Sequence, residues 1–327
     1  MKIIVDAFGG DNAPLEIIKG ALLAKEEYGV DIILTGKENV IKDTAKQNNI
    51  GLSSVEIVNA DSVIAMDEEP GEILKSKSDS SMAVGMKLLA NGGGDGFISA
   101  GNSGAICVGA TMIVKRIKGI KRPGFAAVLP HFNDGCFMLC DSGANVDCRP
   151  EMLKQFARMS SIYMEKVMNI NNPRVGLANI GTEPHKGTEL QHTAYELISA
   201  SGLNFIGNAE GRQLPQGVCD VVICDGFSGN LILKTYEGVA KSVMGEIKKL
   251  FSKNLKNKLA AGIVYSDLKG LKNKFDYHEY GGAPIMGCAK PVFKAHGSAK
   301  ANTIKNAIRL TKNYIDANVI ETISAEL

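Results

Sequence analysis

A repeated pattern constrains this chain more than any other feature: a short apolar segment ends in a glycine-rich, polar turn, and residues that start helices follow. The pattern occurs seven times, at residues 6–14, 99–104, 141–145, 179–183, 207–211, 225–230 and 294–298. Strands that alternate with helices in this way are typical of a mostly parallel α/β sheet. Its turns lie beyond the carboxyl ends of the strands, where open sheets bind ligands. We therefore expect most of the polar chemistry at one edge of one sheet.

The alternation extends along the chain without a low-complexity linker. It predicts strands at 3–7, 31–35, 55–59, 96–99, 126–129, 136–139, 174–179, 204–207, 220–224 and 292–295, and helices at 15–27, 38–47, 80–90, 102–117, 150–168, 185–200 and 298–323. The strands at 126–129 and 136–139 lie too close together for a crossover helix, so we expect an antiparallel pair there. The prediction is one three-layer αβα domain over residues 1–327, with a mixed, mostly parallel sheet.

Residues 239–277 depart from this alternation and have the pattern of an amphipathic helical arm. Apolar residues recur every four positions from Val239 to Ile263. Between residues 239 and 275 there are nine lysines and two acidic residues, which indicates an anionic partner there and not general nucleic-acid binding. The apolar stripe fits packing within the chain or in a homodimer, and it also fits contact with an anionic membrane surface. Gly262 and Gly270 are expected to divide the arm into helices.

The composition, 45% hydrophobic and 22% charged, is that of a globular protein. Because no apolar run approaches about 18 residues, no transmembrane helix is expected. A strand-like segment begins directly after Met1, which leaves no room for a signal peptide and favours a cytoplasmic location. The seven cysteines are scattered without metal-ligand spacing, so we expect buried, reduced thiols and no metal site.

Several turns contain candidate chemistry, and each has a structural alternative. Residues 101–104 have the composition of an anion cradle at a helix start, and a helix cap would have the same composition. Lys186 is either a phosphate ligand or a solvated side chain. Asn230 is either a donor to an oxyanion or part of a helix cap after Asp225. His296 is the best-placed histidine for catalysis, although lone histidines are more often structural.

In these turns the sequence resembles the acyl-ACP:phosphate acyltransferase (PlsX) family. The matching segments run in family order and include VDAFGGDNAP (5–14), ISAGNSGA (98–105), IKRPGFAAVLP (120–130), PRVGLANIGTEPHKG (173–187), DVVICDGFSGNLILKTYEG (220–238), YGGAPIMG (280–287) and KAHGSA (294–299). The resemblance covers nearly the whole chain. Ser76 and Ser78 depart from it, since the family often has basic residues there.

The resemblance implies an enzyme that transfers a fatty acyl group from acyl carrier protein to inorganic phosphate. It also implies an isocitrate/isopropylmalate-dehydrogenase-like αβα fold, a homodimer and peripheral association with the membrane. The acyl phosphate would pass to a membrane-bound glycerol-3-phosphate acyltransferase. No cofactor, neither nicotinamide nor metal, is implied.

A site hypothesis follows from the turns and the resemblance together. Phosphate would bind at Asn102, Ser103 and Gly104, with its charge offset by Lys186. Asn230, together with backbone N–H groups near Gly229, would receive the carbonyl oxygen. His296 is the candidate proton donor to the leaving thiolate. The remaining expected binding residues are Asp6, Gly9, Gly10, Ser99, Gly101, Asn145, Gly181 and Asp225.

Three other functions remain open at this stage. A phosphotransacetylase would use the same chemistry with coenzyme A. A β-hydroxyacid dehydrogenase of the same fold would need a nicotinamide and a divalent metal. A scaffold that binds carrier protein would have no turnover. The lysine-rich arm has two candidate partners, acidic acyl carrier protein and anionic lipid.

Overall fold

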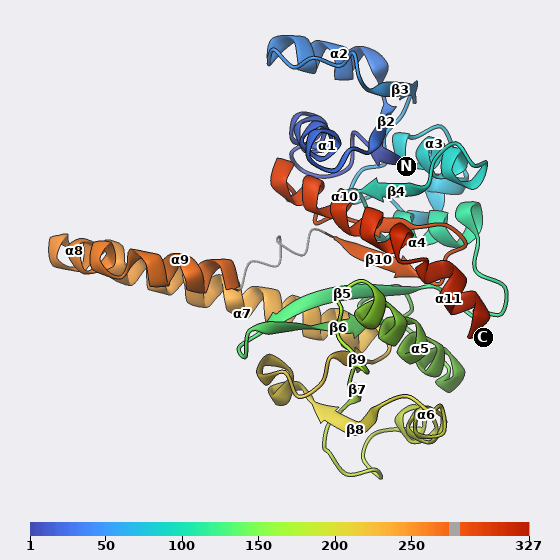
Figure 1. Cartoon of the computed structure of the whole chain (residues 1–327), viewed down its shortest axis with the longest axis vertical. Helices are drawn as coiled ribbons and strands as arrows, with labels where there is room; N and C mark the ends of the chain where they lie inside the picture. Colours follow the sequence, from blue (N-terminus) through green and yellow to red (C-terminus); the bar gives the residue numbers. More distant parts are fainter. Residues whose placement is uncertain (275–281, 327) are drawn as a thin grey trace.

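The computed structural model describes residues 1–274 and 282–326, which form one eleven-stranded sheet with helices on both faces (Figure 1). The strand order is β3-β2-β1-β4-β11-β10-β5-β6-β9-β7-β8. The strands are β1 Lys2–Asp6, β2 Asp31–Gly36, β3 Glu56–Asn59, β4 Gly96–Ser99, β5 Gly124–His131, β6 Gly135–Cys140, β7 Val175–Asn179, β8 Phe205–Glu210, β9 Val221–Ile223, β10 Ala283–Met286 and β11 Val292–Lys294. The predicted αβα class with a mixed, mostly parallel sheet is confirmed.

The sheet contains two parallel groups that run in opposite directions. β1, β2, β3, β4 and β11 are parallel, and β6, β7, β8 and β9 are parallel to one another. β10 is antiparallel to β11 and β5, and the β5–β6 pair is antiparallel as predicted. The expectation of one shared edge is therefore wrong. Turns after β1, β4 and β11 lie at one edge, and turns after β6, β7 and β9 lie at the opposite edge.

The helices confirm most predicted positions. They are α1 Leu15–Tyr28, α2 Glu38–Gln47, α3 Ser81–Ala90, α4 Ser103–Gly109, α5 Pro150–Lys166, α6 Glu189–Ser199, α7 Gly226–Ser252, α8 Leu255–Ile263, α9 Tyr265–Lys274, α10 Ala301–Asp316 and α11 Val319–Ala325. The helix predicted to reach Ile117 instead ends in a π-helical turn at Ala110–Val114. The last predicted helix divides at Asn318, whose φ of 50° interrupts the helical backbone.

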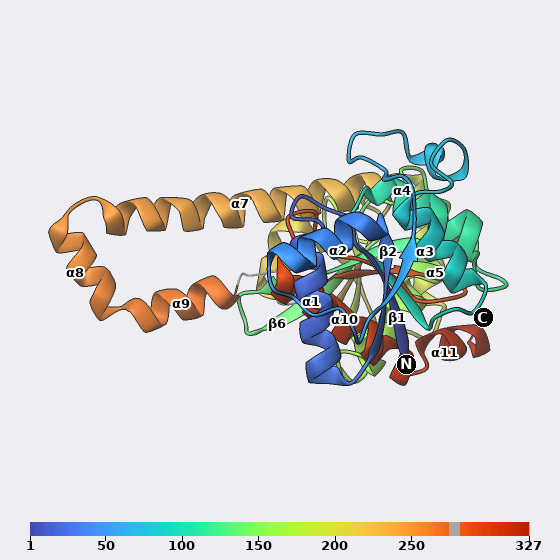
Figure 2. The ribbon, with the colours of Figure 1, turned by 90° about the horizontal axis from the view of Figure 1, so that it is seen from above.

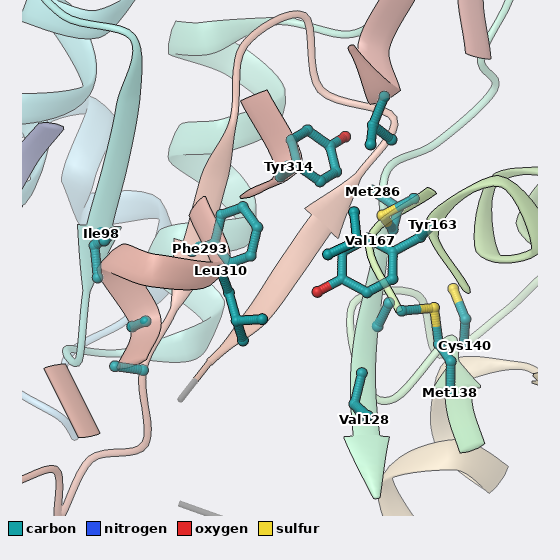
Figure 3. Close-up of a cluster of buried hydrophobic side chains, with 14 of the residues drawn as sticks. Ile98, Val128, Met138, Cys140, Tyr163, Val167, Met286, Phe293, Leu310 and Tyr314 are labelled. Atoms are coloured by element: carbon teal, nitrogen blue, oxygen red, sulfur yellow. The ribbon is translucent and has the colours of Figure 1, made fainter. Parts of the chain in front are cut away.

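One face of the sheet has a continuous apolar core beneath α1, α5 and α10. Figure 3 shows the part of this core that includes Tyr163 of α5 and Tyr314 of α10. Phe293 of β11 packs edge-on against Tyr314 of α10, with ring centroids 5.5 Å apart. The other face has two separate clusters. One lies under α3 and α4 and includes Met86, and the other lies under α7 and includes Leu233. The seam between these two clusters lies along β5, where Phe125 packs against the first cluster and Ala127 and Leu129 belong to the second.

The arm is formed by the distal part of α7 with α8 and α9, and it projects away from the sheet (Figures 1 and 2). The prediction that glycines divide the arm holds near Gly262, because α8 ends at Ile263 and α9 begins at Tyr265, but it is wrong for Gly270, which lies inside α9. The chain also turns at Asn254, whose side chain caps α8 by accepting the N–H of Asn257 at 2.9 Å. Of the predicted arm, residues 275–277 lie outside the described part. Among the described helices, none is both long enough and apolar enough to cross a membrane.

Candidate active site

A cavity of about 330 Å³ lies in the seam, and we call it the seam cavity. Its walls come from β5, from Leu233, Lys234 and Glu237 of α7, and from the start of β10. Lys294 and the turn after β11 contribute a further side, together with Ser103 at the start of α4. The seam cavity therefore lies where the carboxyl ends of β4 and β11 meet α7.

Asp6 and Ser99 form a buried support behind this edge. The Ser99 hydroxyl donates to the Asp6 carboxylate at 2.6 Å and accepts the N–H of Gly101 at 3.0 Å. Burial raises the pKa of Asp6, while hydrogen bonds from Ser81 and Ser99 act against that rise. A side chain on Gly9 would meet the Gly101 nitrogen at 2.6 Å. These contacts shape the turns at this edge of the sheet. The residues that make them, Asp6, Gly9, Ser99 and Gly101, do not line the seam cavity.

The first and last glycine-rich turns are held together directly. Gly10 has a φ of 95°, and a Cβ there would lie 2.7 Å from the Gly297 carbonyl oxygen. The Asp11 N–H donates to that same oxygen at 2.8 Å. The Asn12 amide donates to the Ser298 carbonyl at 3.1 Å. These contacts hold the turn that contains His296 beside the turn after the first strand. The expectation that the turns share one edge is therefore met within the group of β1, β4 and β11.

Asn102 has a structural role. Its amide nitrogen lies within hydrogen-bonding distance of the carbonyl oxygens of Ala65, Met66 and Glu68, and its Oδ1 accepts the Ala105 N–H at 3.0 Å. Asn102 therefore caps α4 and holds the preceding loop with its side chain, and the binding of phosphate at the turn of residues 102–104 stays a prediction. Of the expected cradle, Ser103 lines the seam cavity, while a Cβ on Gly104 would lie 2.5 Å from Pro70.

Two lysines that the sequence hypothesis missed line the seam cavity. Lys294 is buried, and its Nζ donates to the carbonyl oxygens of Ala100, at 3.3 Å, and Ala295. Burial and the positive charge of Lys234 lower the pKa of Lys294 to about 8. Lys234 pairs with Glu237 at 3.1 Å. Two features of the sequence could have pointed to these lysines as site residues. Lys294 belongs to the same short motif as His296, and Lys234 lies one helical turn after Asn230.

His296 also lines the seam cavity and is partly exposed. Its Nδ1 accepts the Ser298 N–H at 3.2 Å and lies 2.8 Å from the Ser298 hydroxyl. These contacts orient the imidazole ring within the turn. The structure thus brings together Ser103 and His296 from the hypothesis with Lys234 and Lys294, which it did not include.

The residues expected at the turns after β6 and β9 lie at the opposite edge and have structural contacts. Asn145 donates to the buried Asp141 carboxylate through its backbone and side-chain nitrogens, both at 2.7 Å. Asp225 caps α7 by accepting the Ser228 N–H at 2.8 Å. A Cβ on Gly229 would lie only 1.8 Å from the Asp141 carbonyl oxygen. Asn145, Asp225 and Gly229 therefore join α7 to the sheet.

Asn230 is exposed and lies one helical turn before Leu233 and Lys234. Residues three and four positions apart share a helix face, so Asn230 continues the stripe of α7 that lines the seam cavity. Asn230 itself does not line the seam cavity, and its side chain lies beside Gly143, where an added Cβ would be 3.5 Å from Asn230 Cβ.

Lys186 and Gly181 lie near the carboxyl end of β7, at the opposite edge. Lys186 does not start a helix as expected, because α6 begins at Glu189 after a Thr188 capping box. Six strand spacings separate β4 from β7, or roughly 29 Å at about 4.8 Å per strand. Within one chain, Lys186 is therefore not placed to offset the charge of a phosphate at Ser103, which corrects that part of the hypothesis.

Comparison with solved structures supports the fold. A phosphotransacetylase from Streptococcus pyogenes superposes with a TM-score of 0.66 at 17% identity, covering 97% of this chain and 94% of that one. A 4-hydroxythreonine-4-phosphate dehydrogenase from Klebsiella pneumoniae gives a TM-score of 0.52 at 12% identity, covering 96% and 98%. At these identities the likeness concerns the fold alone.

Comparison of sequences is more specific. A phosphate acyltransferase from Thermoanaerobacterium thermosaccharolyticum is 47% identical over 327 residues, which is 100% of this chain and 97% of the relative. One from Clostridioides difficile is 44% identical over 324 residues, covering 99% and 95%. The family model described as "Fatty acid synthesis protein" matches residues 1–322. The chain therefore belongs to this fatty acid synthesis protein family, alongside relatives that bear the name phosphate acyltransferase.

Proposed function

We propose that this protein transfers a long-chain fatty acyl group from acyl carrier protein to inorganic phosphate, yielding acyl phosphate for bacterial phospholipid synthesis. By its family it is an acyltransferase. The observation that carries the proposal is the seam cavity, in which Lys294, Lys234 and His296 surround a space at the carboxyl ends of β4 and β11. Two lysines and a histidine at such a position can contact an anionic substrate, and the carboxylates of Asp11 and Glu237 line the same cavity, with Glu237 paired to Lys234.

The proposed reaction does not require a covalent bond between the substrate and the protein. A thioester is already activated and phosphate is already a nucleophile, so the site must hold the two together and stabilise the oxyanion. Ser103, Lys234 and His296 would contact phosphate. Asn230, on the same face of α7, would donate to the carbonyl oxygen. A contribution from Lys186 would have to come from a second copy of the chain.

Coenzyme A is the alternative acyl carrier, as in a phosphotransacetylase. The long-chain proposal is favoured by an apolar groove of about 580 Å³ along α7, which we call the arm groove. Its walls include Leu231, Val239 and Val243 of α7, Phe132 of the β5–β6 hairpin and Leu271 of α9. Such a surface suits an enzyme whose product stays near a membrane.

The same arm supports the proposals of a homodimer and of peripheral membrane association in the cytoplasm. Val239, Leu255, Leu259 and Ile263 are exposed, with Ile263 at 85%. Exposed apolar area of this kind marks an interface with protein or lipid.

The lysines of the arm have two candidate partners, acyl carrier protein and anionic lipid. Replacing Lys253, Lys256 and Lys258 with glutamine distinguishes between them. If liposome binding survives while KM for the carrier protein rises, the lipid assignment is wrong.

The test is phosphate-dependent release of free carrier protein from palmitoyl-ACP, with acyl phosphate trapped as the hydroxamate. Phosphate-dependent acyl hydroxamate is the expected result. Reaction with acetyl-CoA alone would favour the phosphotransacetylase, and absence of reaction with both donors would favour a carrier-protein-binding scaffold.

A further inference from the structure

Lys294 occupies an unusual position for a lysine. It is the last residue of β11, it lines the seam cavity, and only 7% of its surface is exposed. Strand residues alternate between faces, so Lys294 shares the seam face with Val292. An ammonium group has three donors, and the carbonyl oxygens of Ala100 and Ala295 account for two of them among the described residues. The third donor is available to a molecule in the seam cavity.

Charged and titratable groups face Lys294 from several elements. Lys234 of α7 acts against protonation of Lys294, while Asp6 and Asp11 from β1 and its turn, and Cys107 from α4, favour it. Glu237 pairs with Lys234, and His296 lies two residues beyond Lys294 in the same turn. Desolvation is the largest effect, and the pKa of Lys294 falls to about 8. That value is close to the pKa of about 8.5 of an alkyl thiol such as cysteine.

We propose that Lys294 is the catalytic residue that transfers a proton to the departing sulfur during acyl transfer. This inference rests on the proposed function and assigns the proton transfer within it. A phosphate oxygen forms a bond to the thioester carbonyl carbon, and the carbon–sulfur bond breaks with its electron pair on sulfur. The Lys294 ammonium gives a proton to that thiolate. The resulting amine recovers a proton from the hydrogen phosphate that became acyl phosphate, so Lys294 ends the cycle as it began.

The alternative donor, His296, is less suited to this role. Its ring is partly exposed to solvent, and its Nδ1 accepts the Ser298 N–H, a contact that orients the ring. Lys294 is buried, and an efficient proton donor has a pKa near that of its acceptor and near the working pH. His296 remains assigned to phosphate contact.

The test compares Lys294→Arg and Lys294→Met with wild type, using palmitoyl-ACP and phosphate. Arginine keeps the charge but does not release a proton at these pH values. Both variants are expected to lose about 10²-fold or more in kcat, the usual contribution of a general acid. Wild-type kcat/KM should fall above about pH 8, because the donor loses its proton there. Lys294→Arg should not show this fall.

A second variant is expected to change the pKa of Lys294 without replacing Lys294 itself. Lys234→Gln removes the positive charge that opposes protonation, so the alkaline fall of kcat/KM should move to higher pH. A purely structural Lys294 would produce no such shift. Because Lys234 is exposed, this variant also serves if Lys294→Arg fails to fold, as judged by circular dichroism and thermal unfolding.

The possible results separate the two proposals. If wild type forms no acyl hydroxamate from palmitoyl-ACP, the proposed function fails. If wild type is active but Lys294→Arg matches its kcat, or keeps its alkaline fall, the role of Lys294 is overturned while the proposed function stands. An unshifted fall in Lys234→Gln overturns that role as well.

Discussion

The contact between α7 and the Asp141 turn predicts that Gly229→Ala destabilises the protein. A Cβ at Gly229 would lie 1.8 Å from the Asp141 carbonyl oxygen and 2.8 Å from Cys224 Sγ. Ordinary contact begins at 3.4 Å, so helix or turn must move by the difference between 3.4 and 1.8 Å, about 1.6 Å. Overpacking of a buried site costs about 1–3 kcal/mol, and this contact with backbone belongs at the upper end.

Helix propensity acts in the other direction and supplies the control. Alanine is favoured over glycine in a helix by about 1 kcal/mol, which leaves a net loss of about 2 kcal/mol for Gly229→Ala. Gly238 lies in the same helix and is exposed, and a Cβ added there would meet no described atom within 4 Å. Gly238→Ala should therefore be neutral or stabilising by up to about 1 kcal/mol.

Urea unfolding followed by circular dichroism measures both changes under the same conditions. Thermal unfolding gives a second measure, because a net loss of about 2 kcal/mol lowers the Tm of a 327-residue domain by roughly 3 °C. If Gly229→Ala is as stable as Gly238→Ala, the close approach of α7 to the Asp141 turn does not constrain this position. The assignment of Gly229 to packing would then be withdrawn.

Three further predictions concern other contacts. Asn230→Ala should lower kcat by about 10²-fold, as for loss of one oxyanion donor, and near-normal kcat with palmitoyl-ACP would remove it from the site. Asp220→Asn should lower the free energy of unfolding by about 1 kcal/mol at pH 7, since solvent screens this half-exposed pair. Burial raises the pKa of Asp220, but hydrogen bonds from Arg174 bring it below the ordinary value. This stabilisation is present above the unfolded-state pKa of about 3.9 and is lost as pH falls through the lowered folded-state pKa, so the difference in free energy of unfolding between wild type and Asp220→Asn should shrink as the pH is lowered below about 3.9. Burial and the Asp141 charge raise the pKa of Cys148 to about 12, so iodoacetamide at pH 7.5 should label it far more slowly in folded than in urea-unfolded protein, as read by mass spectrometry.

Much of the fold could be predicted from the sequence because apolar runs and turn residues mark element positions directly. The direction of a strand within the sheet, by contrast, cannot be read from its own residues. The short connection between β5 and β6 predicts their antiparallel pairing, but its consequence, reversal of every later strand in that half, depends on pairing between distant segments. β10 was missed because Ala283–Met286 is short and contains a proline.

The candidate site was predicted in part for the same reason. Ser103 and His296 follow strands of the first parallel group, so the turn pattern located them correctly relative to one another. Lys186 follows a strand of the second group, and the pattern alone could not show that its edge is the opposite one. Lys294 is the last residue of β11 and the first of the turn 294–298, so the turn pattern includes it, but only its burial in the folded chain distinguishes it from a surface lysine.

The role of α7 explains how one chain can combine a polar cavity with an apolar arm. Its cap at Asp225 is fixed at one sheet edge, and its third turn, with Leu233 and Lys234, walls the seam cavity. From Leu231 to Ile247 the same helix also lines the arm groove, through residues other than those that line the cavity. Because a helix transmits displacement along its axis, a partner that binds the arm and shifts α7 also shifts Lys234 relative to Lys294.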